Sequence, residues 1–353
     1  MTQTSRTKPT EGLSPDDELK LNVLLAGNVL AVRIDEGARA LYALTEKGEA
    51  RVNLSPIGRP DRYFIHVREL LGRHAMNLPS GYPVHLMRWT RMGQSSPKKL
   101  EQLLKLGEDE AIQAVAHAPT LTDELARRAW WALPTMEVAR VMLSRPAILE
   151  GLMGKQLAQF LAEHLPFEQD QVAAMHTVRA LVASRLLEAH ELEQLWRKAQ
   201  RRPHYLIGFL ETMPDQLPNQ LSYTATERTI EVNMQADTPA TRLLQHCFSS
   251  AGQAYIATAM LVLEKPQTHE AVALLLDMLG AYFQAGQHPE AESQLAAWPN
   301  EAKALVALSQ LKASVAEPIL IRTTAVGPLL RRHLEPLFAP ILANLQILKG
   351  LSA

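Results

Sequence analysis

Two short segments contain residue types that could do chemistry, but neither completes a known motif. Residues 151–156, GLMGKQ, carry the glycines and lysine of a phosphate-binding loop, yet Gln156 stands where a serine or threonine would hold magnesium. Residues 190–194, HELEQ, begin like the zinc-binding helix HExxH, yet Gln194 replaces the second histidine. We therefore expect no catalytic residues, no metal site and no cofactor, and a protein that is not an enzyme.

His246 and Cys247 are a third candidate pair for chemistry. The two residues are adjacent, so a helix would point their side chains about 100° apart. We interpret Cys247 as a small buried side chain. The alternative is an enzyme with a dispersed site, in which Cys247 or His246 would have to line a cavity. A single cysteine excludes a disulfide framework and favours a reducing compartment, so we expect a soluble, cytoplasmic protein.

The segment 125–134, LARRAWWALP, places two tryptophans directly after two arginines and an alanine. On a helical wheel, Trp130 lies at the edge of an apolar stripe, and Trp131 lies outside it, close to Arg127 and Arg128. We predict that Trp130 is buried and that Trp131 contacts Arg127 or Arg128. In the structural interpretation Trp131 fills a contact with a neighbouring helical pair, with an arginine stacked on its ring. In the functional one it is an exposed platform for a base or a partner protein.

Positive charge is concentrated in one region of a nearly neutral chain. The net charge is −1, but residues 59–99 hold eight lysines and arginines against two acids, an excess of +6. Such asymmetry concerns binding partners rather than fold. The excess has two open explanations: docking onto the more acidic remainder of the chain, or binding of an external partner.

Residues 84–92, VHLMRWTRM, are the strongest surface candidate in this basic region. As a strand they would present either an edge whose Trp89 covers a small core, or a docking patch for an acidic protein or for RNA. The signature of RNA-binding sheets is absent, which disfavours RNA. The candidate partner-binding residues of the whole chain are Arg62, Arg68, Arg73, Arg88, Trp89, Arg91, Arg127, Arg128 and Trp131.

The first part of the chain has the pattern of a small α+β module. Short apolar runs separated by turn residues predict strands at 19–25, 30–35, 40–45 and 49–54, with a further strand at 84–92. Residues 60–76 have a helical spacing of apolar side chains.

The rest of the sequence is predominantly helical, and many of the predicted helices are followed by proline at Pro119, Pro134, Pro166 and Pro214. The loose spacing favours an irregular HEAT-like α-solenoid or a bundle over a strict repeat. We also expect strands at 229–233 and 318–324. The expected organisation is a flexible tail at 1–16, an α+β module at 17–94, helical hairpins at 95–214, a linker or insertion at 215–240 and a helical domain at 241–353.

Three stretches resemble the DsrS-type family, which is encoded with the reverse dissimilatory sulfite reductase (Dsr) system of sulfur-oxidising bacteria. They are DELKLNVLLAGNVLAVRID at 17–35, SGYPVHLMRWTRMGQ at 80–94 and LTDELARRAWWALP at 121–134. The resemblance implies a soluble cytoplasmic accessory or regulatory protein of sulfur oxidation, with no established catalytic residues. We expect it to act by protein–protein binding, with a component of the sulfur-oxidation machinery as partner. The alternative is a nucleic-acid-binding regulator that uses the basic region 59–99, with RNA as its partner.

Overall fold

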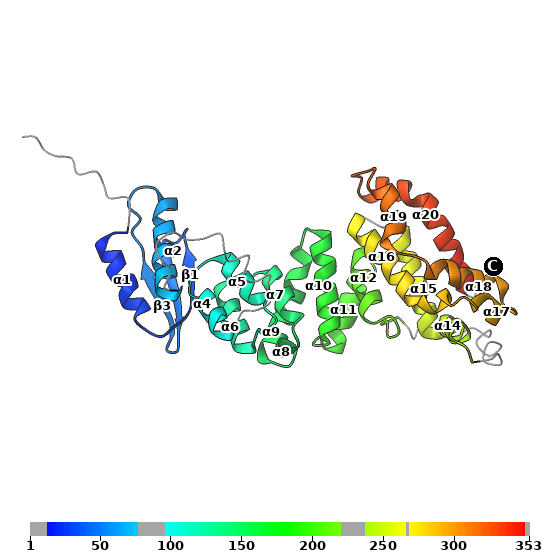
Figure 1. Ribbon diagram of the computed structural model, residues 1–353, viewed down its shortest axis with the longest axis horizontal. Helices are drawn as coiled ribbons and strands as arrows, with labels where there is room; N and C mark the ends of the chain where they lie inside the picture. Colours follow the sequence, from blue (N-terminus) through cyan, green and yellow to red (C-terminus); the bar gives the residue numbers. More distant parts are fainter. Residues whose placement is uncertain (1–12, 77–95, 220–236, 266–267, 350–353) are drawn as a thin grey trace, which may run out of the picture. The chain divides into compact units, whose positions relative to one another are not determined.

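The computed structural model describes residues 13–76, 96–219, 237–265 and 268–349 (Figure 1). Within these ranges the chain is mostly helical and carries one three-stranded antiparallel sheet near its N-terminus. The predicted fold class, a small α+β module followed by a helical region, is confirmed. The chain divides into two compact units, Met1–Leu161 and Ala162–Ala353. This division is coarser than the five segments expected from the sequence, whose boundaries stay predictions.

The N-terminal module begins with a helix where the sequence analysis expected a strand. Its elements are α1 (Pro15–Leu25), β1 (Val29–Asp35), β2 (Ala40–Thr45), β3 (Gly48–Asn53) and α2 (Pro60–Met76). The strand predicted at 19–25 is wrong, and the last two residues of the expected tail 1–16 belong to α1. The Ser14 hydroxyl accepts a hydrogen bond from the Asp17 N–H at 3.1 Å, and Pro15 opens the helix. This cap, with acids in the first turn, outweighs the strand-like run that follows it.

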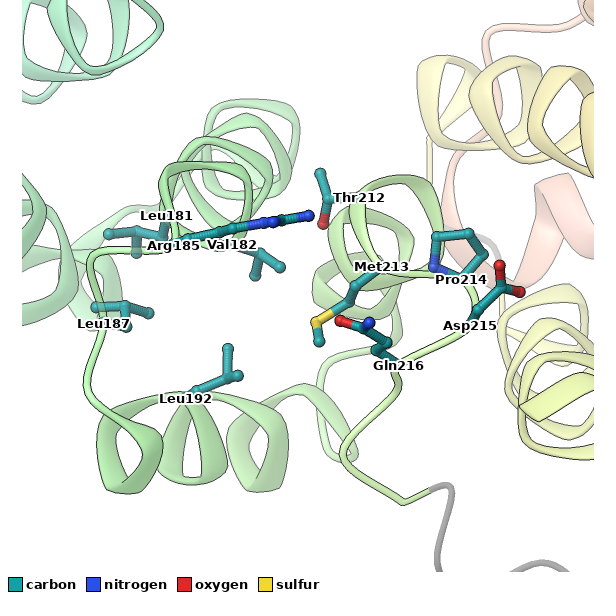
Figure 2. Close-up of a pocket in the computed structure, with 10 residues that line it drawn as sticks. All are labelled: Leu181, Val182, Arg185, Leu187, Leu192, Thr212, Met213, Pro214, Asp215 and Gln216. Atoms are coloured by element: carbon teal, nitrogen blue, oxygen red, sulfur yellow. The ribbon is translucent and has the colours of Figure 1, made fainter. Parts of the chain in front are cut away.

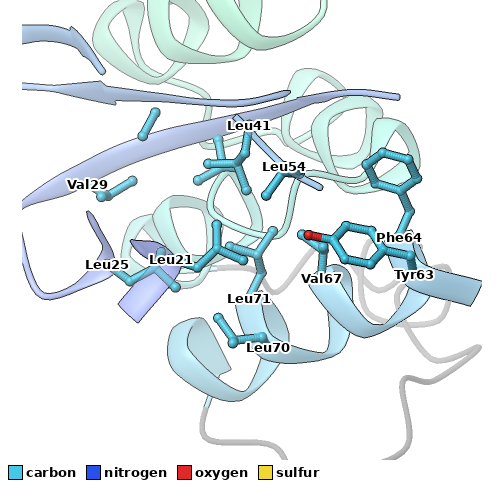
Figure 3. Packing of buried hydrophobic residues seen from close by; sticks show 12 residues of the cluster. Leu21, Leu25, Val29, Leu41, Leu54, Tyr63, Phe64, Val67, Leu70 and Leu71 are labelled. Carbon is cyan, nitrogen blue, oxygen red and sulfur yellow. The ribbon is translucent and has the colours of Figure 1, made fainter. Parts of the chain in front are cut away.

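The sheet has the order β1-β2-β3, and its two faces pack against different parts of the chain. Leu41 and Ala43 of β2 point to the face that α1 and α2 cover. There they pack with Leu21 of α1 and with Phe64 and Val67 of α2 in the core of the module (Figure 3). Alternation along a strand sends the intervening residues to the opposite face.

One buried carboxylate connects three parts of this core. Asp17 is almost fully buried, and it accepts hydrogen bonds from the Tyr63 hydroxyl at 2.7 Å and from the Ser55 N–H at 3.0 Å. Burial acts to raise the pKa of Asp17, but these hydrogen bonds prevail and hold it below its ordinary value. Burial and the adjacent carboxylate raise the pKa of Tyr63, so its hydroxyl remains a donor. Asp17 therefore ties α1 to α2 and to the loop before α2.

Among the described helices that follow in the first unit, two begin at a threonine cap, and the expected prolines Pro119 and Pro134 each come just after a helix end. Thr122 accepts from the Leu125 N–H at 3.3 Å, and Thr135 accepts from the Val138 N–H at 3.3 Å. The helices are α4 (Pro97–Leu103), α5 (Asp109–Ala116), α6 (Asp123–Ala132), α7 (Met136–Leu143), α8 (Pro146–Leu149) and α9 (Leu152–His164). On the edge of the sheet, the Val32 N–H of β1 donates to the Leu104 carbonyl at 2.8 Å, so these helices are attached directly to the module.

In its described residues the second unit contains helices joined by loops, and no strand. Its helices are η1 (Leu165–Phe167), α10 (Gln171–Ser184), α11 (Ala189–Ala199), α12 (Pro203–Thr212), α14 (Pro239–Phe248), α15 (Ser250–Glu264), α16 (His269–Tyr282), η3 (Gln284–Gln287), α17 (Ala291–Gln294), α18 (Pro299–Ser309), α19 (Ala313–Leu320) and α20 (Gly327–Leu348). The strand predicted at 318–324 is wrong. The Asp277 carboxylate accepts from the Ala313 N–H at 2.7 Å, and the helix that starts there extends through Pro318 to Leu320. The strand predicted at 229–233 lies outside the described residues.

Close contact between α10 and α12 depends on a glycine. A Cβ atom at Gly208 would lie 2.8 Å from the backbone nitrogen of Arg179, which is too close for any real side chain. Gly208 therefore lets the two helix backbones approach closely. This approach places the C-terminal ends of α10 and α12 on the two sides of a pocket that is described below.

We predict that Tyr63→Phe lowers the free energy of unfolding by about 1–3 kcal/mol at pH 7, because the buried Asp17 carboxylate loses a hydrogen bond. The folded-state pKa of Asp17 lies below its ordinary value of 3.8, so its stabilisation is present above that pH and is lost as the pH falls. The difference between variant and wild type should therefore shrink in urea unfolding curves measured below about pH 4.

Tyr42→Phe is the matched control for this prediction, since the hydroxyl of this partly exposed residue has no hydrogen-bond partner among the described residues. Equal destabilisation by the two variants would contradict the role of Asp17.

Candidate functional site

Three aligned side chains cross the sheet on the face opposite to the core. Arg33 of β1 pairs with Tyr42 of β2, and Tyr42 pairs with Arg51 of β3. The guanidinium carbons of Arg33 and Arg51 lie 4.7 Å and 5.5 Å from the centre of the Tyr42 ring. Both cations are thus within the range of attraction by the ring face. We call these three residues the arginine–tyrosine row.

Trp131 of α6 packs on this row. The Arg33 guanidinium carbon lies 5.3 Å from the centre of the Trp131 ring. The indole N–H donates to a Glu49 carboxylate oxygen at 3.0 Å, and Arg33 lies 3.7 Å from the same oxygen. Trp131 is partly buried, with both its ring face and its polar atom engaged inside the first unit. This contact corresponds to the structural interpretation of Trp131, with a sheet in place of the expected helical pair.

The cation on the Trp131 ring is Arg33, where the sequence analysis expected Arg127 or Arg128. Those two arginines both donate to the Glu124 carboxylate, at 2.7 Å and 2.8 Å. The hydrogen bond from Arg127, aided by that from Arg128, lowers the pKa of Glu124 to about 2. The pairs lie at helical spacings of three and four residues within α6.

Trp130 is less buried than predicted. Its side chain is partly exposed, and its ring meets the Phe160 ring edge-on, with 4.7 Å between their centres. A position at the edge of the apolar stripe explains this intermediate burial. Trp130 and Trp131 therefore pack against different neighbours, one on α9 and the other on the sheet.

The predicted basic residues of α2 lie on the other side of the sheet from Trp131. Arg68 pairs with Glu36 at 2.6 Å and with Glu108, before α5, at 3.1 Å. Burial raises the pKa of Glu108, and Arg68 opposes that rise. Arg62 and Arg73 are exposed on the same helix. The structure thus does not bring the α2 arginines and the Trp131 cluster into one site.

The predicted residues Arg88, Trp89 and Arg91 lie outside the described residues. Nothing in the structure tests whether they form the expected edge strand or docking patch.

A pocket of about 420 Å³ lies in the second unit, between the ends of α10 and α12 and the start of α11 (Figure 2). Its polar residues are Arg185, Thr212, Asp215 and Gln216. Its apolar residues come from all three helices and their connections: Leu181, Val182, Leu187, Leu192, Met213 and Pro214. Of these positions the sequence analysis named only Pro214, as the proline that follows a helix, and it predicted no site there.

The side chains of His246 and Cys247 have different surroundings, as expected for adjacent residues on a helix. The His246 Nε2 atom lies 2.8 Å from an Asp215 carboxylate oxygen, so His246 is connected to a residue of this pocket without lining it. Cys247 has no exposed surface, and burial raises the pKa of its thiol. The interpretation of Cys247 as a buried side chain is confirmed.

A second surface in the same unit is formed by α19, α20 and their connection. Ile321, Val326 and Leu329 are 76%, 64% and 56% exposed within nine consecutive residues. A pocket of about 390 Å³ adjoins them through Pro328 and reaches Phe338 of α20. We call this region, residues 312–335, the α19–α20 surface.

Metal-binding clusters and membrane-spanning helices are both absent from the described ranges. No group of three or more histidine, cysteine, aspartate or glutamate side chains there could hold a metal ion. No described helix is long and apolar enough to cross a membrane.

No protein-family model, curated protein or solved structure matches this chain. The comparisons therefore assign no role to any residue. The pocket between α10, α11 and α12 and the α19–α20 surface are identified as candidate sites from their geometry alone. The sequence analysis did not identify Arg33, Glu49 or Arg185. Arg33 and Glu49 contact Trp131, which is distant in the chain, and Arg185 has an unusual backbone angle. The left-handed conformation of Arg185 has no sequence signal, since other described helices, among them α6 and α12, also end without a glycine.

We predict that Trp131→Ala lowers the free energy of unfolding by about 2 kcal/mol, roughly half the cost of removing a fully buried tryptophan. Trp131→Phe should cost less, because it keeps a ring beside Arg33. A double-mutant cycle with Arg33→Met, measured by chemical denaturation, should give a coupling of about 0.5–1 kcal/mol. A coupling of zero would show that the two side chains act independently.

We predict that Cys247 does not react with a water-soluble disulfide reagent at pH 8 in the native protein, because the thiol is buried and its pKa is raised. Reaction should appear only in denaturant. Rapid modification of the native protein would contradict the burial of this residue.

Proposed function

We propose that this protein is a non-catalytic accessory or regulatory protein that acts by binding another protein through the α19–α20 surface. The observation that carries the proposal is the exposure of Ile321, Val326 and Leu329 within one short stretch. Single exposed apolar side chains are common on protein surfaces, but a group of large ones is characteristic of interaction sites.

The charges around these side chains suggest the chemistry of the partner. Residues 312–335 contain four lysines and arginines against two glutamates, so the surface has an excess of +2. Arg331 donates to the Glu264 carbonyl at 3.2 Å, whereas Arg322 and Arg332 are exposed. A partner surface with an apolar centre and an acidic rim would complement it, in the usual arrangement of protein interfaces.

The proposed setting is bacterial sulfur oxidation in the cytoplasm, with a component of the reverse Dsr system as partner. Its support is the resemblance of residues 17–35, 80–94 and 121–134 to the DsrS-type family. The nucleic-acid alternative relies on the region 59–99, where Arg68 is paired with two carboxylates. That pairing leaves fewer free cations for phosphate contacts, so we favour a protein partner.

We expect one purified soluble component of the reverse Dsr system to bind the intact protein in isothermal titration calorimetry. The double variant Ile321→Ser/Leu329→Ser should weaken that binding about 10- to 100-fold, because two apolar side chains no longer become buried at the interface. Both side chains are more than half exposed, so the fold should tolerate the change.

The matched control is Leu19→Ser/Val23→Ser on α1, which removes two side chains that are 63% and 67% exposed. This variant should bind like the wild type. Equal weakening by the two double variants, or the absence of binding by every component, would refute the proposal. Binding to RNA that falls steeply with salt would favour the alternative.

A further inference from the structure

The pocket between α10, α11 and α12 combines an apolar lining with a cation at its edge. Leu181 and Val182 of α10, Leu192 of α11 and Met213 at the end of α12 surround the space (Figure 2). Leu181 and Val182 belong to the buried core, so this wall is rigid. In the same view Arg185 extends from the end of α10 toward Thr212, across the upper side of the pocket.

Arg185 has a backbone conformation that arginine rarely adopts. It caps α10 with φ 55° and ψ 23°, in the left-handed region where glycine is the usual residue. Strain at a residue other than glycine motivates a functional hypothesis for its side chain. In the described part of the chain, its guanidinium forms no hydrogen bond or ion pair.

The other polar groups near the pocket are mostly engaged. Thr212 donates its hydroxyl hydrogen to the Gly208 carbonyl at 2.6 Å. Asp215 contacts His246, and in Figure 2 it lies beyond Pro214, at the far side of the pocket from Leu187. Arg185 is therefore the charge available to a ligand, with the Gln216 amide beside it.

We propose that this pocket binds a small anionic amphiphile, whose carboxylate pairs with Arg185 and whose alkyl chain lies against Val182, Leu192 and Met213. A guanidinium favours carboxylates through two parallel hydrogen bonds. The volume of about 420 Å³ is ample for a chain of medium length. This site is separate from the α19–α20 surface, so the protein-binding proposal does not depend on it.

A series of linear carboxylates from acetate to decanoate, titrated calorimetrically into the full-length protein, tests the proposal. Affinity should rise about 3-fold per methylene until the pocket is filled, because each methylene leaves water. Octanoate should bind more tightly than octanol or octylamine, since only the carboxylate pairs with Arg185.

Arg185→Gly separates binding from folding. Glycine relieves the backbone strain, so the melting temperature should stay equal or rise, while octanoate affinity should fall at least 10-fold. Arg39→Gly is the matched control, because Arg39 also has a positive φ, 49°, but lies in the turn between β1 and β2. It should leave octanoate binding unchanged.

Leu192→Ser tests the apolar part of the site and should flatten the dependence on chain length. Octanoate binding that Arg185→Gly leaves unchanged, or affinity independent of chain length, would overturn the proposal. Equal loss of binding in the Arg39→Gly control would show that the ligand binds elsewhere.

Discussion

The packing of Trp131 on the arginine–tyrosine row is the contact on which the first unit depends. A three-stranded sheet has two faces to cover, and α1 and α2 cover one of them. On the other face lie Arg33, Tyr42 and Arg51, of which Arg33 and Tyr42 are partly buried and Arg51 is exposed. The indole ring packs on Arg33 of this row, and its N–H donates to Glu49, so the ring is partly buried without leaving its own N–H unpaired. The sheet and the helices that follow it are thereby held in one unit.

Charged side chains of the basic region 59–99 also find partners within the first unit. Arg68 pairs with Glu36 on one side and with Glu108, before α5, on the other. Arg127 and Arg128, which lie outside the basic region, are likewise paired with Glu124. Part of the positive excess that the sequence displays is thus balanced inside the unit, as expected of internal docking. Arg62 and Arg73 on α2 remain exposed to solvent.

Local signals in the sequence predicted much of the fold. The turn residues between the apolar runs predicted β1, β2 and β3, because a hairpin turn depends on neighbouring residues. The threonine caps of α6 and α7 are equally local, since each accepts from an N–H three residues further on. The strand predicted at 19–25 is wrong because these residues belong to α1. The residue that caps this helix, Ser14, lies outside the apolar run 19–25 from which the strand was predicted. The strand predicted at 318–324 failed because the helix is started from another element, by Asp277 of α16.

The candidate sites were harder to predict than the fold. Arg33 reaches the Trp131 ring only after the chain has folded, and no periodicity links the two positions. Arg127 and Arg128 were predicted at the ring because helical spacing is the only proximity that a sequence displays. The pocket beside Arg185 is assembled from three helices and their connections, so no single stretch of the sequence indicates it.

Hydrogen–deuterium exchange of the Arg33→Ala variant tests most directly whether Trp131 couples the sheet to α6. The substitution is on β1, and the informative amides are those of Asp123–Ala132 in α6. We predict that these amides lose protection together with those of β2, because the two elements open as one unit. Loss of protection confined to the sheet, with α6 exchanging as in the wild type, would contradict the account.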